Sequence, residues 1–461
     1  MIPRLNGDEL SSRFDYYAAL TRKGVAGFII FGGEIDVVRD GLRELQRISE
    51  RPLIIASDLE QGLGQHVRGG TLFPPAMAIA SAVRKAGVGS ASSLLTKLYS
   101  AFAQEALYAG INTIFAPVLD INTNPKNPII ATRSFGEDPE TVSYLGCEMI
   151  DIIQGNNVIA CGKHFPGHGD TDIDSHISLP VLNRGLFDLE NNELIPFRRA
   201  IDCGVKMIML GHLSVPAIDP SGIPVSLSAM AVSYLRNIMG FKGIVITDAM
   251  NMGGIGKFTE EEASVMALKA GVDIILHPKD PDNIAAYLRQ NNLSMESLNL
   301  NISTPPNDLK PGFDDNRRLS EEMTRMAIRT EGAAHIKNPF IIIITDDEDE
   351  DGRYFIAALR KKHPDIKHCS ILPGVDIPWQ TIPPGHDLLI SIFSNVRAWK
   401  GDTKRWVMSA ISRLKDRAKI FAAFGNPYLL NEGSGDMRIY AYWASKEAQE
   451  AAAEKIMILR S

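Results

Sequence analysis

The chain has 461 residues, well above the usual size of a single domain, so at least two domains are expected. Hydrophobic residues make up 45% and charged residues 22%, which excludes an intrinsically disordered chain. With 48 basic and 55 acidic residues the net charge is −7, so nothing in the charge balance indicates a nucleic-acid partner.

Short apolar runs alternate with helical patterns through the first part of the chain. Because the runs are continuously apolar, they predict parallel strands that are covered on both faces. The seven runs are Gly27–Phe31, Pro52–Ala56, Ile111–Pro117, Val158–His164, Val205–Gly211, Gly243–Thr247 and Val272–Leu276. The predicted fold is α/β, a (β/α)8-type barrel rather than an open sheet. Since such a barrel needs eight strands, we expect one strand to be missing or irregular.

Polar residues follow the ends of these runs: Asp58, Glu60, Asp120, His164, His212, Asp248 and His277. Barrels carry their chemistry at the face where the strands end, so this set marks the expected active-site face.

A second α/β alternation begins near Phe340. Its runs predict a smaller, doubly wound, flavodoxin-like domain: Phe340–Thr345, Ile366–Leu372, Asp387–Ser391, Ala418–Phe424 and Met437–Tyr442. The acidic loop Asp346–Asp351 would repel a phosphate at the usual cofactor position of such a fold, so we expect no cofactor.

The text from about Asn299 to Arg318 is rich in Asn, Pro and Asp and indicates a linker. An amphipathic helix is expected over Ser320–Ile336, with Ser320 as its N-cap. The predicted organisation is a catalytic barrel over residues 1–300, a linker and connecting helix over 301–337, and a small α/β domain over 338–461.

The four cysteines lie far apart and form no CxxC pair, so we expect reduced, buried thiols. No stretch approaches the roughly 20 apolar residues of a membrane span, or the apolar core of a signal peptide. The sequence therefore predicts a cytoplasmic protein with no membrane partner. The oligomeric state is left open.

The run Lys163–His176, KHFPGHGDTDIDSH, carries more reactive side chains than packing requires. Asp174 and His176 are candidates for a catalytic pair, because residues i and i+2 of an extended segment point the same way and a carboxylate can orient an imidazole. A structural polar loop is the plain alternative. A metal site would use imidazole with carboxylate, from His164, His168 and His176 with Asp170 or Asp174.

Asp248 closes the apolar run Gly243–Thr247. A carboxylate at the tip of a strand can act as a nucleophile or a base, and it can equally be the N-cap of the next helix. The residue alone leaves both interpretations open.

Together these motifs resemble glycoside hydrolase family 3, and within it the bacterial β-N-acetylglucosaminidases. The similar segments occur in the family's order from about Gly27 to Ile336: Asp58-Leu59-Glu60, Phe115–Asp120, Arg133–Pro139, Lys163–His176 and Thr247–Met250. The Lys163–His176 segment is the most specific, since its Asp-Ser-His end distinguishes this subgroup from the family's β-glucosidases.

The resemblance implies roles for particular residues. Asp248 matches the nucleophile, His176 the general acid/base and Asp174 its partner, in a retaining double displacement. The groups that would hold the hydroxyls of the terminal sugar are Asp58, Arg133, Lys163 and His164. Arg68 matches a further sugar-contacting arginine only if about two extra residues after Glu60 are looped out. No metal ligand is assigned.

The function that the resemblance implies is removal of terminal N-acetylglucosamine from peptidoglycan- or chitin-derived fragments by an exo-acting hydrolase that needs no cofactor. Phosphorolysis is an alternative, because an imidazole repels an incoming phosphate less than a carboxylate does. A β-glucosidase of the same family, a metal-dependent hydrolase and a non-catalytic carbohydrate-binding protein are the others.

Overall fold

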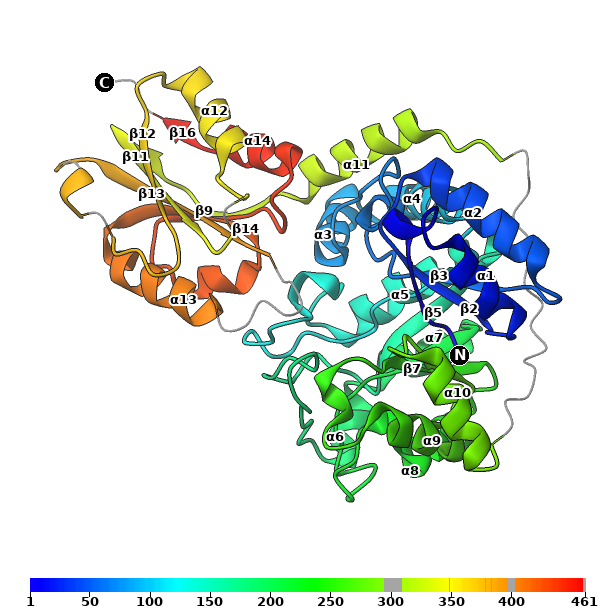
Figure 1. The fold of residues 1–461 in the computed structure, drawn as a ribbon. Coiled ribbons are helices and arrows are strands. Elements are labelled where there is room, and N and C mark those ends of the chain that lie inside the picture. The colour runs from blue at the N-terminus through cyan, green and yellow to red at the C-terminus, as the bar shows by residue number, and fades with distance from the viewer. Residues whose placement is uncertain (294–308, 348, 378, 383, 396–402, 459–461) are drawn as a thin grey trace. The chain divides into compact units, whose positions relative to one another are not determined.

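A computed structural model describes residues 1–293, 309–347, 349–377, 379–382, 384–395 and 403–458. Half of the expected linker text, residues 299–308, lies outside the described residues. The chain divides into two compact units (Figure 1). The first comprises Met1–Phe73, Ser92–Asn127 and Ser134–Leu319, and the second comprises Pro74–Ala91, Pro128–Arg133 and Ser320–Ser461.

The first unit is built on eight parallel strands that pair in chain order. They are β1 (Arg4–Asn6), β2 (Gly27–Phe31), β3 (Ile54–Ser57), β4 (Thr113–Ile114), β5 (Ile159–Phe165), β6 (Met207–Leu210), β7 (Ile244–Ala249) and β8 (Ile274–Leu276). An isolated parallel bridge between Ile2 and Leu276 joins the first strand to the last, and Ile2 N–H donates to Ile275 O at 2.9 Å. These strands confirm the barrel.

The strand that was expected to be missing or irregular is present, and it is short. The eighth strand is β1, which has only three residues, Arg4, Leu5 and Asn6. Because two of the three are polar, the segment contains no apolar run that sequence patterning could detect.

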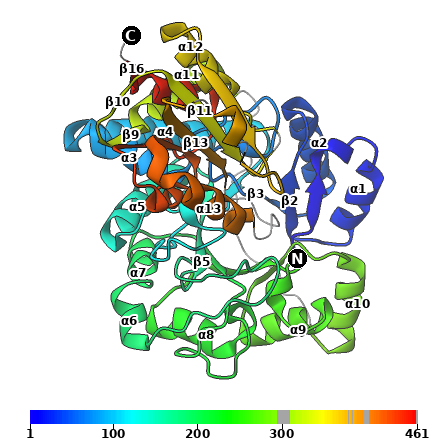
Figure 2. The same cartoon turned by 90° about the vertical axis from the view of Figure 1, so that its left-hand side faces the viewer.

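Helices surround these strands, as Figure 2 shows. They are α1 (Phe14–Arg22), α2 (Ile35–Ile48), α4 (Val88–Tyr108), α5 (Pro139–Gly155), α6 (Leu186–Asn191), α7 (Ile195–Asp202), α8 (Ala229–Ser233), α9 (Glu260–Ala270) and α10 (Pro281–Gln290). The buried residues of α2, Val38, Leu42 and Leu45, follow helical spacing. Among the described residues, no helix combines the length and apolar character needed to cross a membrane.

Alternate strand positions fill the barrel interior with apolar side chains, including Ile2, Ile29, Ala56, Cys161, Ile246 and Leu276. Residues two positions apart on a strand share a face. The inward row therefore continues into polar residues at the mouth of the barrel: Asp58 after Ala56, Lys163 after Cys161 and Asp248 after Ile246.

The expectation of reduced, buried cysteines holds in full only for Cys161, since two others form a disulfide and Cys369 is only partly buried. Cys147 on α5 and Cys203, directly after α7, form a disulfide with Cα atoms 5.9 Å apart. The two residues are 56 positions apart, and only the packing of α5 against α7 brings them together. Cys161 and Cys369 are free.

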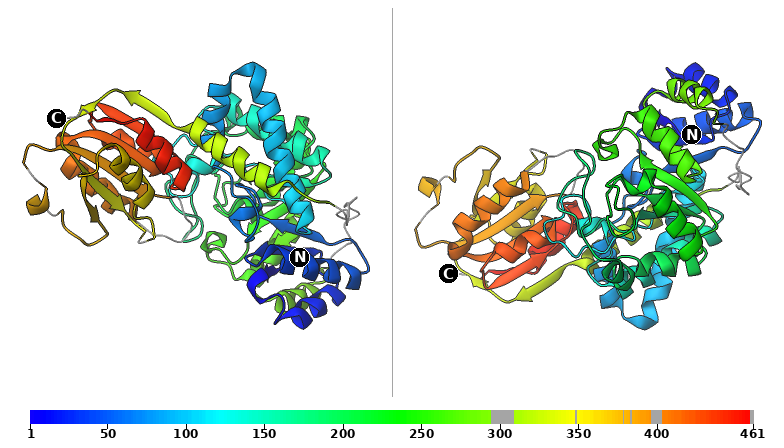
Figure 3. Two further views of the ribbon diagram at one scale, coloured as in Figure 1. Left: turned by 90° about the horizontal axis from the view of Figure 1, so that it is seen from above. Right: turned by 90° about the horizontal axis from the view of Figure 1, so that it is seen from below.

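The second unit contains a six-stranded sheet in the order β12-β11-β13-β14-β15-β9. Its strands are β9 (Arg329–Gly332), β11 (Pro339–Thr345), β12 (Lys367–Ile371), β13 (Asp387–Ser394), β14 (Ala418–Gly425) and β15 (Met437–Tyr440), and β10 (His335–Ile336) pairs with β16 (Met457–Ile458). Helices α12 (Arg353–Lys362) and α14 (Lys446–Glu454) lie on one face and α13 (Thr403–Leu414) on the other (Figure 3). Helix α3 (Ala76–Ala86) also groups with this unit.

Sequence reasoning misplaced the connecting helix. Helix α11 spans Phe313–Ala327, so Ser320 lies in its interior and is buried instead of capping it. The residues expected to complete the helix form β9, which pairs antiparallel with β15. Pairing at the sheet edge overrides the helical pattern of residues 329–332.

Candidate active site

A buried lysine lies at the mouth of the barrel. Nζ of Lys163, on β5, is 2.7 Å from Asp58 Oδ1 and 2.7 Å from Glu60 Oε1, and its side chain is 2% exposed. Two carboxylates on one ammonium compensate the cost of burying the charge. The Asp58 side chain is 29% exposed, so one face of this cluster is open to a ligand. Glu60 was not among the predicted site residues, although its motif was.

The next residue on β5, His164, is oriented by Asp120. Asp120 Oδ2 lies 2.7 Å from His164 Nδ1, and Oδ1 accepts the backbone N–H groups of His164 and His168. Burial would raise the pKa of Asp120, but the neighbouring imidazoles and the N–H donors outweigh it and hold the pKa below its usual range. Because Nδ1 faces Asp120, Nε2 of His164 is left for other partners. Sequence reasoning placed Asp120 at a strand end and gave it no role.

His168 continues the same network. Its Nδ1 lies 2.7 Å from Thr171 Oγ1, and burial lowers its pKa to about 4. Within the described part of the chain, its buried Nε2 has no hydrogen-bond partner. His168 is therefore a neutral imidazole at pH 7.

The structure brings the expected catalytic pair together. Asp174 Oδ1 accepts the backbone N–H of His176 at 2.8 Å and lies 2.7 Å from His176 Nδ1. The expected extended segment was wrong, since Ile177 N–H and Ser178 N–H both donate to Asp174 O and close a turn. In this turn the carboxylate fixes the ring and directs Nε2 away from itself.

The loop that carries His176 lies against the chain that follows β7. Gly253 N–H donates to His176 O at 3.1 Å. A Cβ on Gly253 would lie 2.5 Å from Ile177 O, and one on Gly254 would lie 2.8 Å from Ser175 O. The absence of side chains at these two glycines allows the loop that carries His176 to approach the turn just beyond Asp248.

Asp248, in β7, is a partly exposed carboxylate that accepts Ala249 N–H at 2.7 Å. Burial would raise its pKa, but His164, His212 and His176 outweigh this effect, so the pKa lies below the usual range of a carboxyl group. His212 is itself held between Ser226 Oγ, 2.7 Å from Nδ1, and Ala249 O, 3.1 Å from Nε2. Asp248 is therefore an ionised carboxylate at neutral pH.

Each of the two predicted arginines has partners within its own unit. Arg68 binds Asp8 at 2.6 Å and Glu34 at 2.5 Å through Nη2 and Nε, in ion pairs outside the Asp58–Lys163 cluster. Arg133 ends a short 3-10 turn of the second unit, and its Nη1 donates to Ile129 O at 2.9 Å.

The three imidazoles considered for a metal ion have separate partners. Nδ1 of His164, His168 and His176 faces Asp120, Thr171 and Asp174 respectively. Nowhere in the described residues do three His, Cys, Asp or Glu side chains gather in an arrangement suited to a metal ion.

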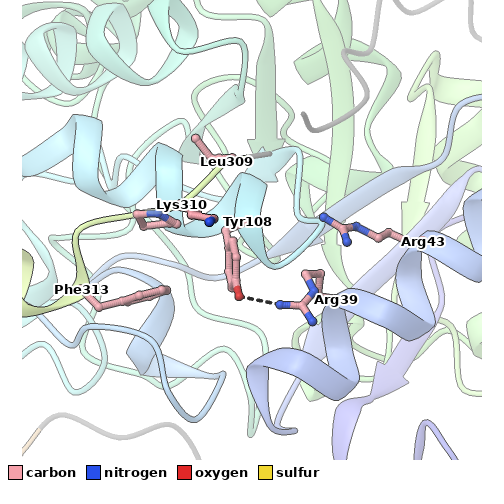
Figure 4. Close-up of a pocket in the computed structure, with 7 residues that line it drawn as sticks. Arg39, Arg43, Tyr108, Leu309, Lys310 and Phe313 are labelled. Atoms are coloured by element: carbon pink, nitrogen blue, oxygen red, sulfur yellow. Dashed lines mark hydrogen bonds between the residues drawn. The ribbon is translucent and has the colours of Figure 1, made fainter. Parts of the chain in front are cut away.

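A cavity of about 430 Å³ lies away from these groups, between α2, the end of α4 and residues 309–313 (Figure 4). Arg39 Nη1 donates to Tyr108 OH within it, and Asp36 and Asp40 compensate the charge of Arg39. None of the predicted site residues lines this cavity, so we do not assign it to the sugar site.

Comparisons with known proteins agree with this geometry. Residues 9–303 match the family model described as the glycosyl hydrolase family 3 N terminal domain. Beta-hexosaminidase A of Pseudoalteromonas piscicida is 36% identical over 248 residues, covering 50% of this chain and 41% of that protein. The beta-hexosaminidase of Chromobacterium violaceum is 32% identical over 277 residues, covering 59% of this chain and 76% of that protein.

A solved structure resembles nearly the whole chain. It is a glycoside hydrolase family 3 beta-N-acetylglucosaminidase from Paenibacillus sp. str. FPU-7, 26% identical with a TM-score of 0.77, and the match covers 99% of this chain and 95% of that one. The chain spans less than half the length of two of the curated relatives that it matches.

Proposed function

Since this chain belongs to glycoside hydrolase family 3, we propose that it is an exo-acting, retaining β-N-acetylglucosaminidase that removes terminal N-acetylglucosamine from peptidoglycan- or chitin-derived fragments. Some relatives are matched over most of their own length, and their names support this activity. The beta-hexosaminidase of Chromobacterium violaceum is one of them. One structural observation carries the proposal: the Asp174–His176 pair is hydrogen-bonded through His176 O to the turn that follows Asp248.

In the first chemical step Asp248 is the nucleophile. Its low pKa keeps the carboxylate ionised at neutral pH, and it attacks the anomeric carbon as the bond to the leaving oxygen breaks. His176 gives the proton from Nε2 to that oxygen, and the carboxylate of Asp174 stabilises the imidazolium before transfer. The products are a glycosyl ester on Asp248 and the released alcohol.

In the second step the same imidazole, now neutral, takes a proton from water. The water oxygen attacks the anomeric carbon and releases Asp248 as a carboxylate, so the sugar leaves with its original configuration. Phosphate could replace water at this point, because His176 is uncharged when the second nucleophile arrives.

We propose that polar side chains at the ends of strands β3 and β5 bind the sugar. Asp58 accepts hydrogen bonds from hydroxyls, while Lys163 and His164 supply polar groups beside it. Glu60 and Asp120 hold these two side chains in place from behind. The sugar-binding roles of Arg133 and Arg68 stay predictions from the resemblance.

Turnover of an aryl N-acetyl-β-glucosaminide, compared with the matching aryl glucoside, tests the proposal. We expect the N-acetylated substrate to be preferred, with free N-acetylglucosamine as the product and no effect of a chelator. Preference for the glucoside would indicate a β-glucosidase, and a sugar 1-phosphate formed with added phosphate would indicate a phosphorylase. Chelator-sensitive turnover, or sugar binding without turnover, would contradict the proposed mechanism.

We also propose that the protein acts in the cytoplasm, as the sequence predicts. The Cys147–Cys203 disulfide argues the other way, because such bonds are typical of oxidising compartments. Thiol titration of protein purified under anaerobic conditions would decide: four free thiols support the cytoplasm, and two contradict it.

A further inference from the structure

Arg4 faces the interior of the barrel. It pairs with Ile29 in the parallel register of β1 and β2, and Asn6 pairs with Phe31. Residues in register on neighbouring strands project to the same face, and Ile29 belongs to the interior cluster. Ile2, two positions before Arg4, belongs to it as well. Yet Arg4 is exposed, so its side chain reaches the open mouth instead of the closed core.

The guanidinium of Arg4 is not neutralised by a carboxylate. Its Cζ lies 4.9 Å from the centre of the Phe31 ring, which positions the group by a cation–π contact. Within the described residues Arg4 forms no hydrogen bond or ion pair. Arg68, by contrast, is bound to both Asp8 and Glu34.

This corner of the mouth also contains Asp58. The Phe31 ring contacts His66 at 4.8 Å and His277 at 6.2 Å between ring centres. Burial lowers the pKa of His66 and brings that of His277 to about 4, so both imidazoles are neutral at pH 7. Arg4 pairs with Ile29 and Ile29 pairs with Ala56, and Asp58 follows Ala56 by two residues, so Arg4 and Asp58 belong to the same inward-facing side of neighbouring strands.

We propose that Arg4 donates hydrogen bonds to an oxygen of the terminal sugar that Asp58 holds, the role that sequence reasoning gave to Arg68. A carboxylate only accepts hydrogen bonds, so a sugar with vicinal hydroxyls also needs a donor beside Asp58. Lys163 already directs Nζ at Asp58 and Glu60, whereas the donors of Arg4 are all uncommitted. This inference rests on the proposed function, since it assigns one more contact in the same site.

Three variants test this assignment: Arg4→Met, Arg4→Lys and the control Arg47→Met, at an exposed position of α2 whose side chain pairs with Glu44. Methionine keeps the length of the side chain and its packing on Phe31, and removes the donors. For Arg4→Met we expect kcat/KM for an aryl N-acetyl-β-glucosaminide to fall by about 10- to 100-fold, as for loss of a charge-assisted hydrogen bond. Arg4→Lys should recover part of the loss, and Arg47→Met should stay within about twofold of wild type.

Two further measurements separate binding from folding. Competitive inhibition by N-acetylglucosamine should weaken in Arg4→Met while the thermal midpoint stays that of wild type. Substrates that lack one ring hydroxyl, or whose acetamido group is replaced by hydroxyl, identify the oxygen. Wild type should discriminate against one of these substrates, and Arg4→Met should lose that discrimination alone.

The outcomes distinguish this inference from the proposed function. If wild type is active and Arg4→Met behaves like Arg47→Met, Arg4 does not bind the sugar and the proposed function stands. If wild type neither cleaves the glycoside nor binds the sugar, both are overturned. A loss in Arg4→Met that spreads evenly over all substrates, together with a lowered thermal midpoint, assigns Arg4 a structural role instead.

Discussion

The barrel mouth holds its charged groups in two ways. Asp58, Lys163 and Asp248 stand in strands or directly after them, where sheet hydrogen bonds fix the backbone. Asp174 and His176 lie in a loop beyond β5, and a backbone contact with Gly253 holds that loop. The positions of the strand-borne groups therefore depend on the charges of their neighbours. The position of the loop-borne pair depends on the close approach of its backbone to a glycine that has no side chain. Changes in the two regions should have different kinetic signatures.

Removal of the proposed nucleophile, Asp248 in β7, should have the largest effect. Asp248→Ala leaves no carboxylate to attack the anomeric carbon, so we expect kcat/KM to fall by about 10⁴-fold or more with every aryl leaving group. Steady-state rates across a series of aryl N-acetyl-β-glucosaminides measure the effect, with the thermal midpoint as the control for folding. Unchanged turnover would remove Asp248 from the mechanism.

The free energy of unfolding should depend on pH through His168, which lies between strand β5 and the loop that carries His176. Burial lowers its pKa from the usual 6.5 to about 4. Between these values the unfolded chain binds a proton that the native chain does not, so the free energy of unfolding falls as pH is lowered, by about 3 kcal/mol from this imidazole. His168→Asn should flatten that dependence in urea unfolding at pH 7 and pH 4.5. The control His335→Asn, at an exposed position, should leave the dependence unchanged. An equal dependence of the unfolding free energy on pH in all three proteins would contradict the role given to His168.

Two glutamates that bind basic residues differ in burial. Glu60 meets buried Lys163 with a side chain 8% exposed, while Glu34 meets Arg68 with a side chain 60% exposed. Glu60→Gln should lower the free energy of unfolding by about 2 kcal/mol, because a buried charge loses one of its partners. Glu34→Gln should cost less than about 1 kcal/mol. Denaturant unfolding compares the two, and equal losses would mean that the Lys163 cluster is not held by burial.

The sequence predicted the parts of the fold that depend on long apolar runs. Strands β2 to β8 each coincide with such a run, and so do β11, β13 and β14, while β12 and β15 lie where the second α/β alternation predicts strands. Strand β1 escaped detection because Arg4 and Asn6 face the mouth, where polar residues are tolerated. The disulfide and strand β9 escaped because both depend on which elements become neighbours in space, a property that local pattern does not contain.

The candidate site was predictable to a similar degree. The Lys163–His176 segment identified Asp174 and His176. The structure brings the Asp174 carboxylate into contact with the His176 ring. Spacing along the chain could not tell Arg68, bound to two carboxylates, from Arg4, whose donors stay uncommitted. Neither could it show that Glu60 and Asp120 hold Lys163 and His164 from behind, since those contacts join different strands.

The loop-borne pair should respond to a methyl group at Gly253, the smallest change considered. In Gly253→Ala the new Cβ would lie 2.5 Å from Ile177 O, so the loop that carries His176 must shift. We expect kcat to fall by about tenfold for substrates with poor leaving groups, which need the proton from His176, and less for activated aryl substrates. Gly155→Ala is the matched control, because nothing lies within 4 Å of a Cβ there. An equal loss with all leaving groups would mean that Gly253 supports the nucleophile's strand as much as the acid/base loop, and the contrast between the two regions would fail.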